Sequence, residues 1–313
     1  MAVISVPDDF PAVLASSGAW NDLAARAAVR YHDNLPASED QLIERIADAE
    51  AVLNIRSSVK FTERVFAASP GVRMLSVWGT GTDHVDLAAA ARHGVAISNT
   101  PGVAASSVAE HALALLLAAA RRIPEMDAAV RRGEWPRGQS LDLHGKTCGV
   151  IGLGAIGRAF VGLAAGIGMS VIAWTPHPRP VEGAQLVELD ALYRTSDAIS
   201  LHLRLSDGTR GFVGASQFAL MKRGAILVNT ARGGIVDEAA LVDALAEGRI
   251  RAAGLDVFAA EPLPAGSPLR KLTNLVITPH CAGNSPDVVE AGLEMAVRNI
   301  WAFFDGRPEN LVP

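Results

Sequence analysis

Cysteine is scarce in this chain, which has only Cys148 and Cys281 among 313 residues. Two cysteines cannot form a disulfide framework, and these two lack the spacing of a metal-binding motif. We interpret both as small buried hydrophobic residues rather than as reactive thiols. The sequence therefore predicts no metal site.

Long hydrophobic runs are also missing, although half of the residues are hydrophobic. The longest apolar stretch, 112–120, is too short to span a bilayer, so we expect no membrane partner. No basic segment followed by an apolar segment opens the chain, because Pro7 and Asp8 arrive too early for a secretory signal. We expect a cytoplasmic protein.

The chain also has no excess of positive charge. The chain carries 28 basic and 33 acidic residues, a formal net charge of −5. This balance argues against a nucleic-acid partner. What remains is a soluble globular protein, whose length suggests about two domains.

Glycine is plentiful, and one glycine motif is the most informative feature present. An apolar strand, 147–151, leads into Gly152-Leu153-Gly154-Ala155-Ile156-Gly157, and a helix-compatible run, 158–167, and a second strand, 171–174, follow. In this context the three glycines allow a tight turn, a close approach of the backbone to a pyrophosphate, and close helix packing. A glycine-rich chain can produce this spacing by chance, but the flanking strands favour a dinucleotide site. The N-terminus of the helix would face the phosphates.

Strands and helices alternate through most of the chain, which predicts parallel sheets. We expect two doubly wound parallel-sheet α/β domains, Rossmann-like or flavodoxin-like, separated by a cleft. A long helix, about 104–120, begins the second domain, and a final helix, 286–304, returns to the first. The strands that we expect are 2–6, 29–31, 51–53, 74–77, 95–97, 147–151, 171–174, 198–203, 225–228, 252–257 and 275–278.

Two turns of the first domain follow strand ends, where parallel sheets bind ligands. They are Arg56-Ser57-Ser58 and Trp78-Gly79-Thr80-Gly81. Such turns can present backbone N–H groups to an anion, or they can be tight connections without a ligand. The segment 121–144 is long for a connection, and it is either an arm that packs on another subunit or a solvated excursion.

Three polar residues follow strand ends after the glycine motif: Arg232, Glu261 and His280. Taken singly, each has an ordinary interpretation as a surface charge, a turn residue or a structural histidine. Behind a dinucleotide motif, however, all three should lie along one sheet edge beside a nicotinamide ring. Together they favour hydride-transfer chemistry.

These residues resemble those of the D-isomer-specific 2-hydroxyacid dehydrogenases over nearly the whole chain. The resemblance rests on the glycine motif, on 229–237 (Asn-Thr-Ala-Arg-Gly-Gly-Ile-Val-Asp), on Gly-Leu-Asp-Val-Phe at 254–258 with Glu261-Pro262, and on Thr278-Pro279-His280. It implies a discontinuous substrate domain, 1–99 with 286–313, and a dinucleotide-binding domain, 100–285. It also implies a homodimer and an NAD(P)-dependent enzyme that interconverts a short 2-oxo acid and its D-2-hydroxy acid.

The resemblance also implies residue roles. His280 would act as general acid/base, Glu261 would orient it, and Arg232 would hold the substrate carboxylate. Substrate contacts are expected at Ser57, Trp78, Gly79, Thr80, Arg232 and His280. Cofactor contacts are expected at Gly152, Gly154, Ala155, Ile156, Gly157, Thr175, Pro176, His177, His202, Leu203, Thr209, Thr230, Ala231, Asp256 and Gly283.

The sequence departs from the family at the end of the strand 171–174. The family commonly has an Asp there that binds the adenosine ribose, whereas this chain has Thr175, followed by Pro176 and His177. A neutral hydroxyl with basic neighbours tolerates a 2′-phosphate, so we expect NADP(H) preference or dual use.

Further features narrow the substrate. Glu261 stands where formate dehydrogenases of this fold have Gln, and the chain ends soon after the last helix, leaving no room for the regulatory domain of many phosphoglycerate dehydrogenases. Glyoxylate, hydroxypyruvate and pyruvate are the preferred candidates, with phosphite or a bulkier 2-oxo acid as alternatives. Two other classes stay open. A dinucleotide-sensing partner protein of the same fold could retain all these motifs, whereas a Rossmann-like methyltransferase would not explain Arg232, Glu261 and His280.

Overall fold

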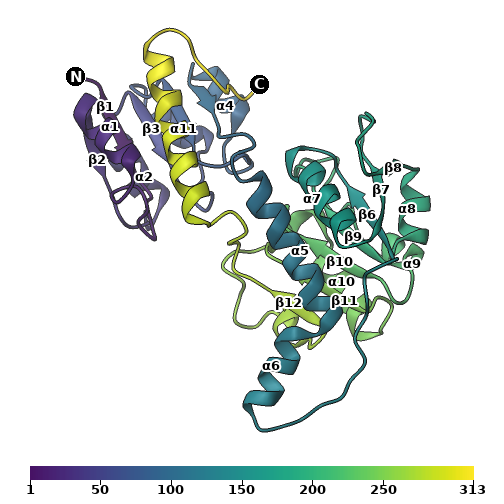
Figure 1. Cartoon of the computed structure of the whole chain (residues 1–313). Helices are drawn as coiled ribbons and strands as arrows, with labels where there is room; N and C mark the ends of the chain where they lie inside the picture. Colours follow the sequence, from purple (N-terminus) through teal and green to yellow (C-terminus); the bar gives the residue numbers. More distant parts are fainter. The chain divides into compact units, whose positions relative to one another are not determined.

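The structure, a computed structural model, describes residues 1–313 and divides into two compact units. The first unit comprises Met1–Ala104 and Asn284–Pro313, and the second comprises Ala105–Gly283 (Figure 1). Each unit is an α/β layer structure built on one parallel sheet. The predicted fold class, two doubly wound parallel-sheet domains, is confirmed.

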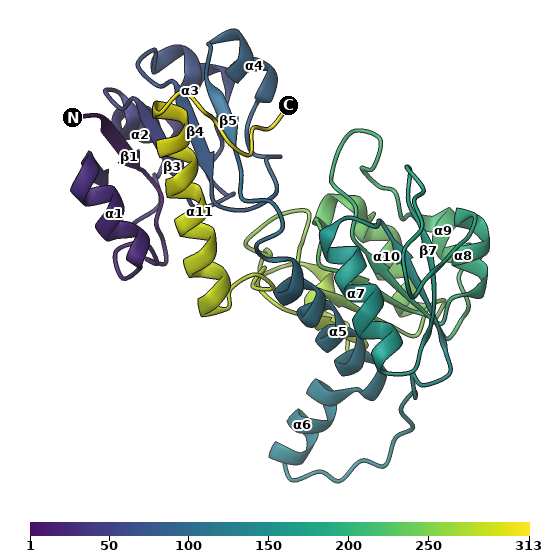
Figure 2. The same ribbon diagram turned by 45° about the horizontal axis from the view of Figure 1, so that its top comes forward.

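The sheet of the first unit has the strand order β2-β1-β3-β4-β5, and every pairing in it is parallel. Helices cover both of its faces, as Figure 2 shows. This strand order is that of flavodoxin-like folds. The strands are β1 (Val3–Val6), β2 (Ala28–Tyr31), β3 (Ala51–Asn54), β4 (Met74–Val77) and β5 (Ala96–Ser98). The helices are α1 (Gly18–Arg26), α2 (Glu39–Ile46), α3 (Glu63–Ala68), α4 (Leu87–Arg92) and α11 (Pro286–Phe304).

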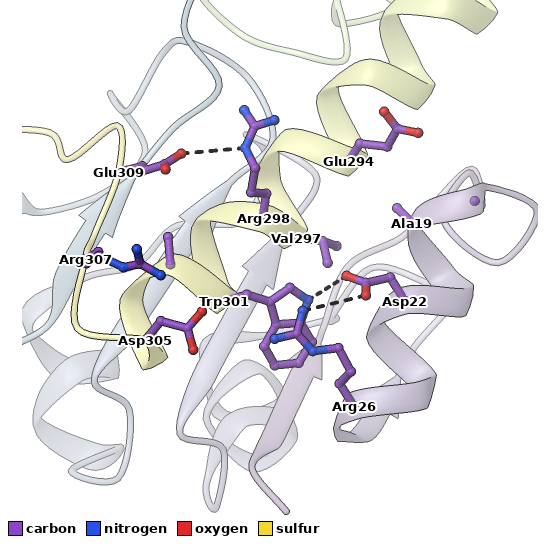
Figure 3. A pocket seen from close by; sticks show the side chains of 12 residues that line it. Ala19, Asp22, Arg26, Glu294, Val297, Arg298, Trp301, Asp305, Arg307 and Glu309 are labelled. Atoms are coloured by element: carbon purple, nitrogen blue, oxygen red, sulfur yellow. Dashed lines mark hydrogen bonds and ion pairs between the residues drawn. The ribbon is translucent and has the colours of Figure 1, made fainter.

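The last helix, α11, belongs to the first unit although it lies at the far end of the sequence. Leu293 and Ile300 of α11 are fully buried in the same hydrophobic cluster as Ile4 of β1. On the outer side of α11, the indole N–H of Trp301 donates to Asp22 of α1 at 2.7 Å (Figure 3). The apolar stripe of α11 therefore serves as part of the core of the first unit.

The sheet of the second unit has the order β12-β11-β10-β9-β6-β7-β8, again wholly parallel. Apart from the edge strand β12, this is the order of a dinucleotide-binding Rossmann sheet. The strands are β6 (Thr147–Ile151), β7 (Ser170–Trp174), β8 (Gln185–Leu186), β9 (Ala198–Leu201), β10 (Ile226–Asn229), β11 (Ala252–Leu255) and β12 (Leu275–Ile277). The helices are α5 (Ala105–Arg121), α6 (Ile123–Arg131), α7 (Ala155–Gly166), α8 (Leu189–Thr195), α9 (Ala215–Leu220) and α10 (Glu238–Ala246).

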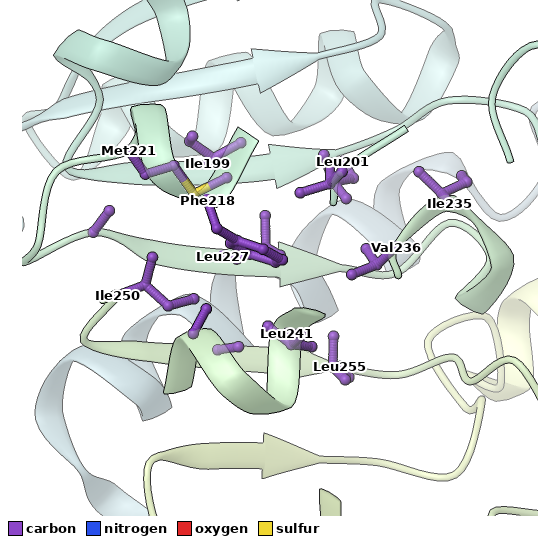
Figure 4. Close-up of a cluster of buried hydrophobic side chains, with 14 of the residues drawn as sticks. Ile199, Leu201, Phe218, Met221, Leu227, Ile235, Val236, Leu241, Ile250 and Leu255 are labelled. Atoms are coloured by element: carbon purple, nitrogen blue, oxygen red, sulfur yellow. The ribbon is translucent and has the colours of Figure 1, made fainter. Parts of the chain in front are cut away.

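Two hydrophobic clusters hold this sheet, one on each face. One of them joins Leu227 of β10 to Phe218 of α9 and Leu241 of α10 (Figure 4). The other packs α5 and α7 on the opposite face. No helix combines the length and the apolar character that a bilayer-spanning segment needs.

Two differences from the expected boundaries bear on function. The first helix after β6 begins at Ala155 rather than at 158, because Gly154 is extended (φ −70°, ψ −170°) and serves as its N-cap. The N–H groups of its first turn therefore lie inside the glycine motif. Strands β9 and β11 end two residues earlier than expected, at Leu201 and Leu255, so that His202 and Asp256 lie just beyond the sheet edge.

Candidate active site

The glycine turn after β6 has three glycines, and each meets a different constraint. Gly152 has φ +100°, and a Cβ there would lie 2.5 Å from the carbonyl oxygen of His202. A Cβ on Gly157 would lie 2.0 Å from the carbonyl oxygen of Gly152, so the helix can approach the turn only without a side chain. A Cβ on Gly154 would meet nothing within 4 Å. Nothing in the chain itself explains the middle glycine, whereas a bound pyrophosphate would need this open space.

His202 directly follows β9, the next strand along the edge, and its side chain is uncharged. Burial lowers its pKa to about 3. Its Nε2 lies 2.9 Å from Ser200 Oγ, and its ring packs on Phe160 with centroids 5.1 Å apart. His202 thus shapes the turn as a neutral group and adds no positive charge to a phosphate site.

Thr230, just beyond β10, has a buried hydroxyl without a hydrogen-bond partner. Buried hydroxyl groups are rarely left unpaired, so this atom indicates where a ligand contributes a polar group. Together with the space beside Gly154 and the helix N-terminus at Ala155, it fits a dinucleotide lying along the carboxyl edge from β6 to β10.

His280 and Glu261 form the central pair of the site. His280 Nδ1 lies 2.7 Å from Glu261 Oε2, and the N–H of Phe258 donates to Glu261 Oε1 at 2.8 Å. Burial raises the pKa of Glu261, but hydrogen bonding to His280 and the positive charge of Arg232 outweigh it and hold the pKa below its ordinary value. The carboxylate is therefore charged and fixes the imidazole with Nδ1–H toward it, which leaves Nε2 for chemistry.

Asp256 holds the backbone that carries His280. Its fully buried carboxylate accepts from the N–H of Cys281 at 2.9 Å, from the N–H of Ala282 at 3.0 Å and from Thr278 Oγ1 at 2.6 Å. The N–H of His280 donates to the carbonyl of Asp256 at 2.8 Å. His280 has φ +52°, a strained conformation for a non-glycine residue, and these four bonds maintain it.

Arg232 reaches this pair because two loops pack backbone against backbone. A Cβ on Gly233 would lie 1.9 Å from the carbonyl carbon of Phe258, so the loop after β10 lies directly on the loop that carries Glu261. The side chain of Asn229 fixes the loop by accepting from the N–H of Ala231 at 3.0 Å and donating to the carbonyl of Arg232 at 2.9 Å. The half-buried guanidinium stands close enough to Glu261 to lower the pKa of that carboxyl.

Five neighbouring strands of the second unit are thus each followed by residues that the sequence analysis predicted for the site. The order is His280 after β12, Asp256 and Glu261 after β11, Thr230 to Arg232 after β10, His202 and Leu203 after β9, and Gly152 to Gly157 after β6. Thr175, Pro176 and His177 follow β7, and Gly283 is the last residue of this unit. Thr209 lies in the loop after β9, where its hydroxyl donates to the carbonyl of Arg204 at 2.7 Å and closes a local turn.

The predicted substrate residues of the first unit follow β3 and β4. Gly79 has φ +131°, which favours glycine. Two N–H groups of this turn are bound within the unit: that of Trp78 donates to the carbonyl of Asn54 at 2.8 Å, and that of Gly79 to Thr100 Oγ1 at 2.8 Å. An anion at this turn must therefore use other donors, among them the N–H groups of Thr80 and Ser57.

Arg56 is a candidate that the sequence did not single out. Its side chain is only 17% exposed, its Nε has no partner, and its guanidinium lies 5.6 Å from the ring centroid of Trp78. Burial lowers the pKa of Arg56. The signal was its place directly after a strand, in the turn with Ser57, but an arginine there usually indicates a surface charge.

The interpretation of Cys281 as a buried hydrophobic residue is wrong. Cys148 is fully buried in β6, but Cys281 is partly exposed beside Asp256. Burial and the neighbouring carboxylate raise the pKa of Cys281, so its thiol is not an activated nucleophile. The error arose because the polar surroundings of Cys281 come from residues distant in sequence.

Comparison with known proteins agrees with this geometry. Residues 113–282 match the model of the D-isomer specific 2-hydroxyacid dehydrogenase NAD binding domain. The chain is 40% identical over 293 residues to a glyoxylate reductase of Korarchaeum cryptofilum, covering 90% of this chain and 88% of that protein. It is 41% identical to a D-3-phosphoglycerate dehydrogenase of Methanocaldococcus jannaschii, covering 88% of this chain but only 54% of that protein.

A solved structure extends the similarity. An acyclic imino acid reductase (Bsp5), solved in complex with NADPH and D-Arg, superimposes with a TM-score of 0.92 at 29% identity, over 99% of this chain and 100% of that one.

Proposed function

Because this chain belongs to the D-isomer-specific 2-hydroxyacid dehydrogenase family, we propose that it reduces a short 2-oxo acid to the D-2-hydroxy acid, with His280 as general acid. The observation that carries the proposal is the 2.7 Å contact between His280 Nδ1 and Glu261 Oε2, on the same sheet edge as the glycine turn after β6. In the reverse direction His280 takes up the proton as a general base.

The residues of the chain would handle the proton and the substrate charge. A nicotinamide cofactor held at this sheet edge would supply the hydride chemistry. His280, held through Nδ1 by Glu261, delivers a proton from Nε2 to the carbonyl oxygen, and the carboxylate of Glu261 stabilises the imidazolium before that transfer. Arg232 offers a planar pair of donors to the substrate carboxylate.

The first unit would contribute to the substrate site through Arg56 and the Thr80 turn. A buried guanidinium with an unpaired Nε is suited to an anionic ligand, because a carboxylate would satisfy a donor that is otherwise stranded. Ser57, the next residue in the chain, and Trp78, whose ring centroid lies 5.6 Å from the guanidinium, are further proposed substrate contacts.

Glyoxylate and hydroxypyruvate are our preferred substrates, followed by pyruvate. The glyoxylate reductase relative supports this choice, because it matches nearly the whole chain. The phosphoglycerate dehydrogenase relative matches a similar share of this chain, which spans about half of that protein's length.

NADP(H) preference or dual use is the proposed cofactor specificity. Thr175, partly exposed after β7, brings no carboxylate to the position where an Asp would repel a 2′-phosphate, and Arg179 lies exposed four residues further on. The related imino acid reductase, whose structure contains NADPH, also supports this specificity.

The assembly we propose is a homodimer formed through α6 and the segment after it. This arm carries an unusual concentration of exposed large apolar side chains: Trp135 is 76% exposed, Ile123 54% and Val130 49%. This surface supports the arm interpretation of residues 121–144. A molar mass from light scattering tests it, and a monomer would exclude the dimer.

A substrate screen tests the function. The oxidation of NADH and NADPH is followed by absorbance with glyoxylate, hydroxypyruvate, pyruvate and longer 2-oxo acids. We expect turnover with at least one short acid, and a loss of about 100-fold or more in His280→Ala, the scale of general acid catalysis. His93→Ala is the matched control, because His93 pairs with Glu63 on the surface of the first unit. No turnover with any acid would favour the dinucleotide-sensing alternative, and a clear advantage of NADH would exclude the proposed NADP(H) preference.

A further inference from the structure

A cluster of side chains that could bind a metal ion adjoins the loop that carries His280. It consists of His111 on α5, Asp256 after β11 and Cys281 after β12. Their donor atoms, an imidazole nitrogen, a carboxylate oxygen and a thiol sulfur, all lie within 4.8 Å of one another. Because the three residues come from separate elements, no spacing in the sequence indicates the cluster.

The spacing of the donors is close to that of a tetrahedral metal site. Zinc binds nitrogen and oxygen ligands at about 2.0–2.2 Å, which places two such ligands of a tetrahedron roughly 3.4 Å apart. His111 Nε2 and Asp256 Oδ1 are 3.5 Å apart. The imidazole and the carboxylate therefore already have the required separation, and the sulfur of Cys281 lies within 4.8 Å of both donor atoms.

Hydrogen bonding accounts for the cluster without an ion, but it leaves the site open to one. Thr278 Oγ1 bridges the pair, 2.9 Å from His111 Nε2 and 2.6 Å from Asp256 Oδ1. Asp256 is fully buried, whereas His111 and Cys281 are partly exposed, so a cation can enter past these two side chains. A nitrogen, oxygen and sulfur donor set suits a borderline-soft divalent cation rather than Mg²⁺ or Ca²⁺.

We propose that this cluster binds Zn²⁺ and that the bound ion inhibits the protein. Bonds form from the ion to His111 Nε2, Asp256 Oδ1 and Cys281 Sγ, with water as the fourth ligand. The proton of the thiol leaves to solvent, and Thr278 loses its hydrogen bond to Asp256.

Inhibition follows from the other role of Asp256. The same carboxylate holds the N–H groups of Cys281 and Ala282, and its backbone carbonyl accepts from the N–H of His280. An ion bound to Oδ1 competes there with the N–H of Cys281 and with the hydroxyl of Thr278, so it loosens this loop and shifts the imidazole that the loop carries. Catalysis requires the reacting groups to be positioned to well within about 1 Å, so such a shift lowers activity.

The first test measures binding and does not depend on turnover. The full-length protein, freed of metal by a chelator, is titrated with ZnCl₂ by calorimetry and with CoCl₂ by absorbance, where a cobalt–thiolate band reports the sulfur ligand. We expect one ion per chain and an affinity at least about 10-fold weaker in Cys281→Ala and in His111→Ala. His93→Ala is the matched control: it removes a histidine that pairs with Glu63 on the surface of the first unit, and it leaves the affinity unchanged.

The second test measures inhibition with whichever 2-oxo acid the screen identifies. Zinc should inhibit the wild type reversibly, with activity restored by a chelator, and should inhibit Cys281→Ala at least about 10-fold less effectively. Binding without a cobalt–thiolate band, equal affinity in Cys281→Ala, or no binding to the wild type would overturn the proposal. If the screen finds no substrate, the binding test still decides whether the site exists.

Discussion

The replacement Glu261→Gln tests the proposed acid most directly. The side chain keeps its shape but loses its charge and one of its two acceptor oxygens. Glu261 now accepts from two donors, His280 at 2.7 Å and the N–H of Phe258 at 2.8 Å. A glutamine has one oxygen for both, so one of the two bonds is lost and the imidazolium loses its carboxylate partner.

The magnitude follows from the geometry. A hydrogen bond to a charged group contributes about 1.5–3 kcal/mol, and since the side chains of His280 and Glu261 are 36% and 33% exposed, solvent screening favours the lower part of that range. A loss of about 1–2 kcal/mol lowers kcat for reduction roughly 5- to 30-fold. Because a charged carboxylate no longer stands beside Nδ1, the pH dependence of reduction should also differ between the variant and the wild type.

The assay is the pH dependence of reduction with saturating cofactor, together with a single-turnover measurement that isolates the chemical step. Glu238→Gln is the matched control, because Glu238 accepts from the N–H of Ala259 at 2.6 Å without touching His280. If Glu261→Gln keeps the wild-type profile and kcat within about twofold while chemistry limits the rate, the pair has no role in proton transfer.

Two further predictions concern the dinucleotide turn and the pH dependence of stability. Gly154→Ala should leave the melting temperature unchanged but weaken cofactor binding, measured by fluorescence titration, since its Cβ meets only open space. Gly157→Ala should lower the free energy of unfolding by about 1–3 kcal/mol or more, because its Cβ lies 2.0 Å from a backbone oxygen; equal stability of the two variants would contradict this assignment. Burial raises the pKa of Asp8 from 3.8 to about 6, so the folded state binds this proton more tightly than the unfolded state. The contribution of Asp8 to stability is therefore greatest below about pH 4 and declines by on the order of 3 kcal/mol as the pH rises through 6. Urea unfolding across this range should show that decline in the wild type relative to Asp8→Asn, and parallel curves for the two proteins would refute it.

The order of strands and helices along the chain could be predicted from the sequence, because local residue patterns encode it. The apolar run 147–151 and the glycine motif predicted β6 and the start of α7, and Pro286 predicted the beginning of α11. Short elements such as β8 were missed, because two residues carry no periodicity.

Only part of the candidate site could be predicted from the sequence. Three of its residues follow predicted strand ends: Arg232, Glu261 and His280. Because the carboxyl ends of parallel strands meet at one edge of a sheet, the three were expected to lie along that edge. Arg56 was not among the expected site residues, since its burial and the lack of a partner for its Nε arise only when distant segments pack.

The sequence by itself determined the fold class and the glycine turn, and it supplied the proposed site residues His280, Glu261 and Arg232, because each depends on residue type and on position relative to a strand end. The tertiary structure alone decided the pairing of His280 with Glu261, the burial of Asp256 and its approach to His111 and Cys281. The physical reason is that these contacts join elements separated by up to 170 residues, from His111 to Cys281, and a hydrogen bond depends on distances that only packing sets.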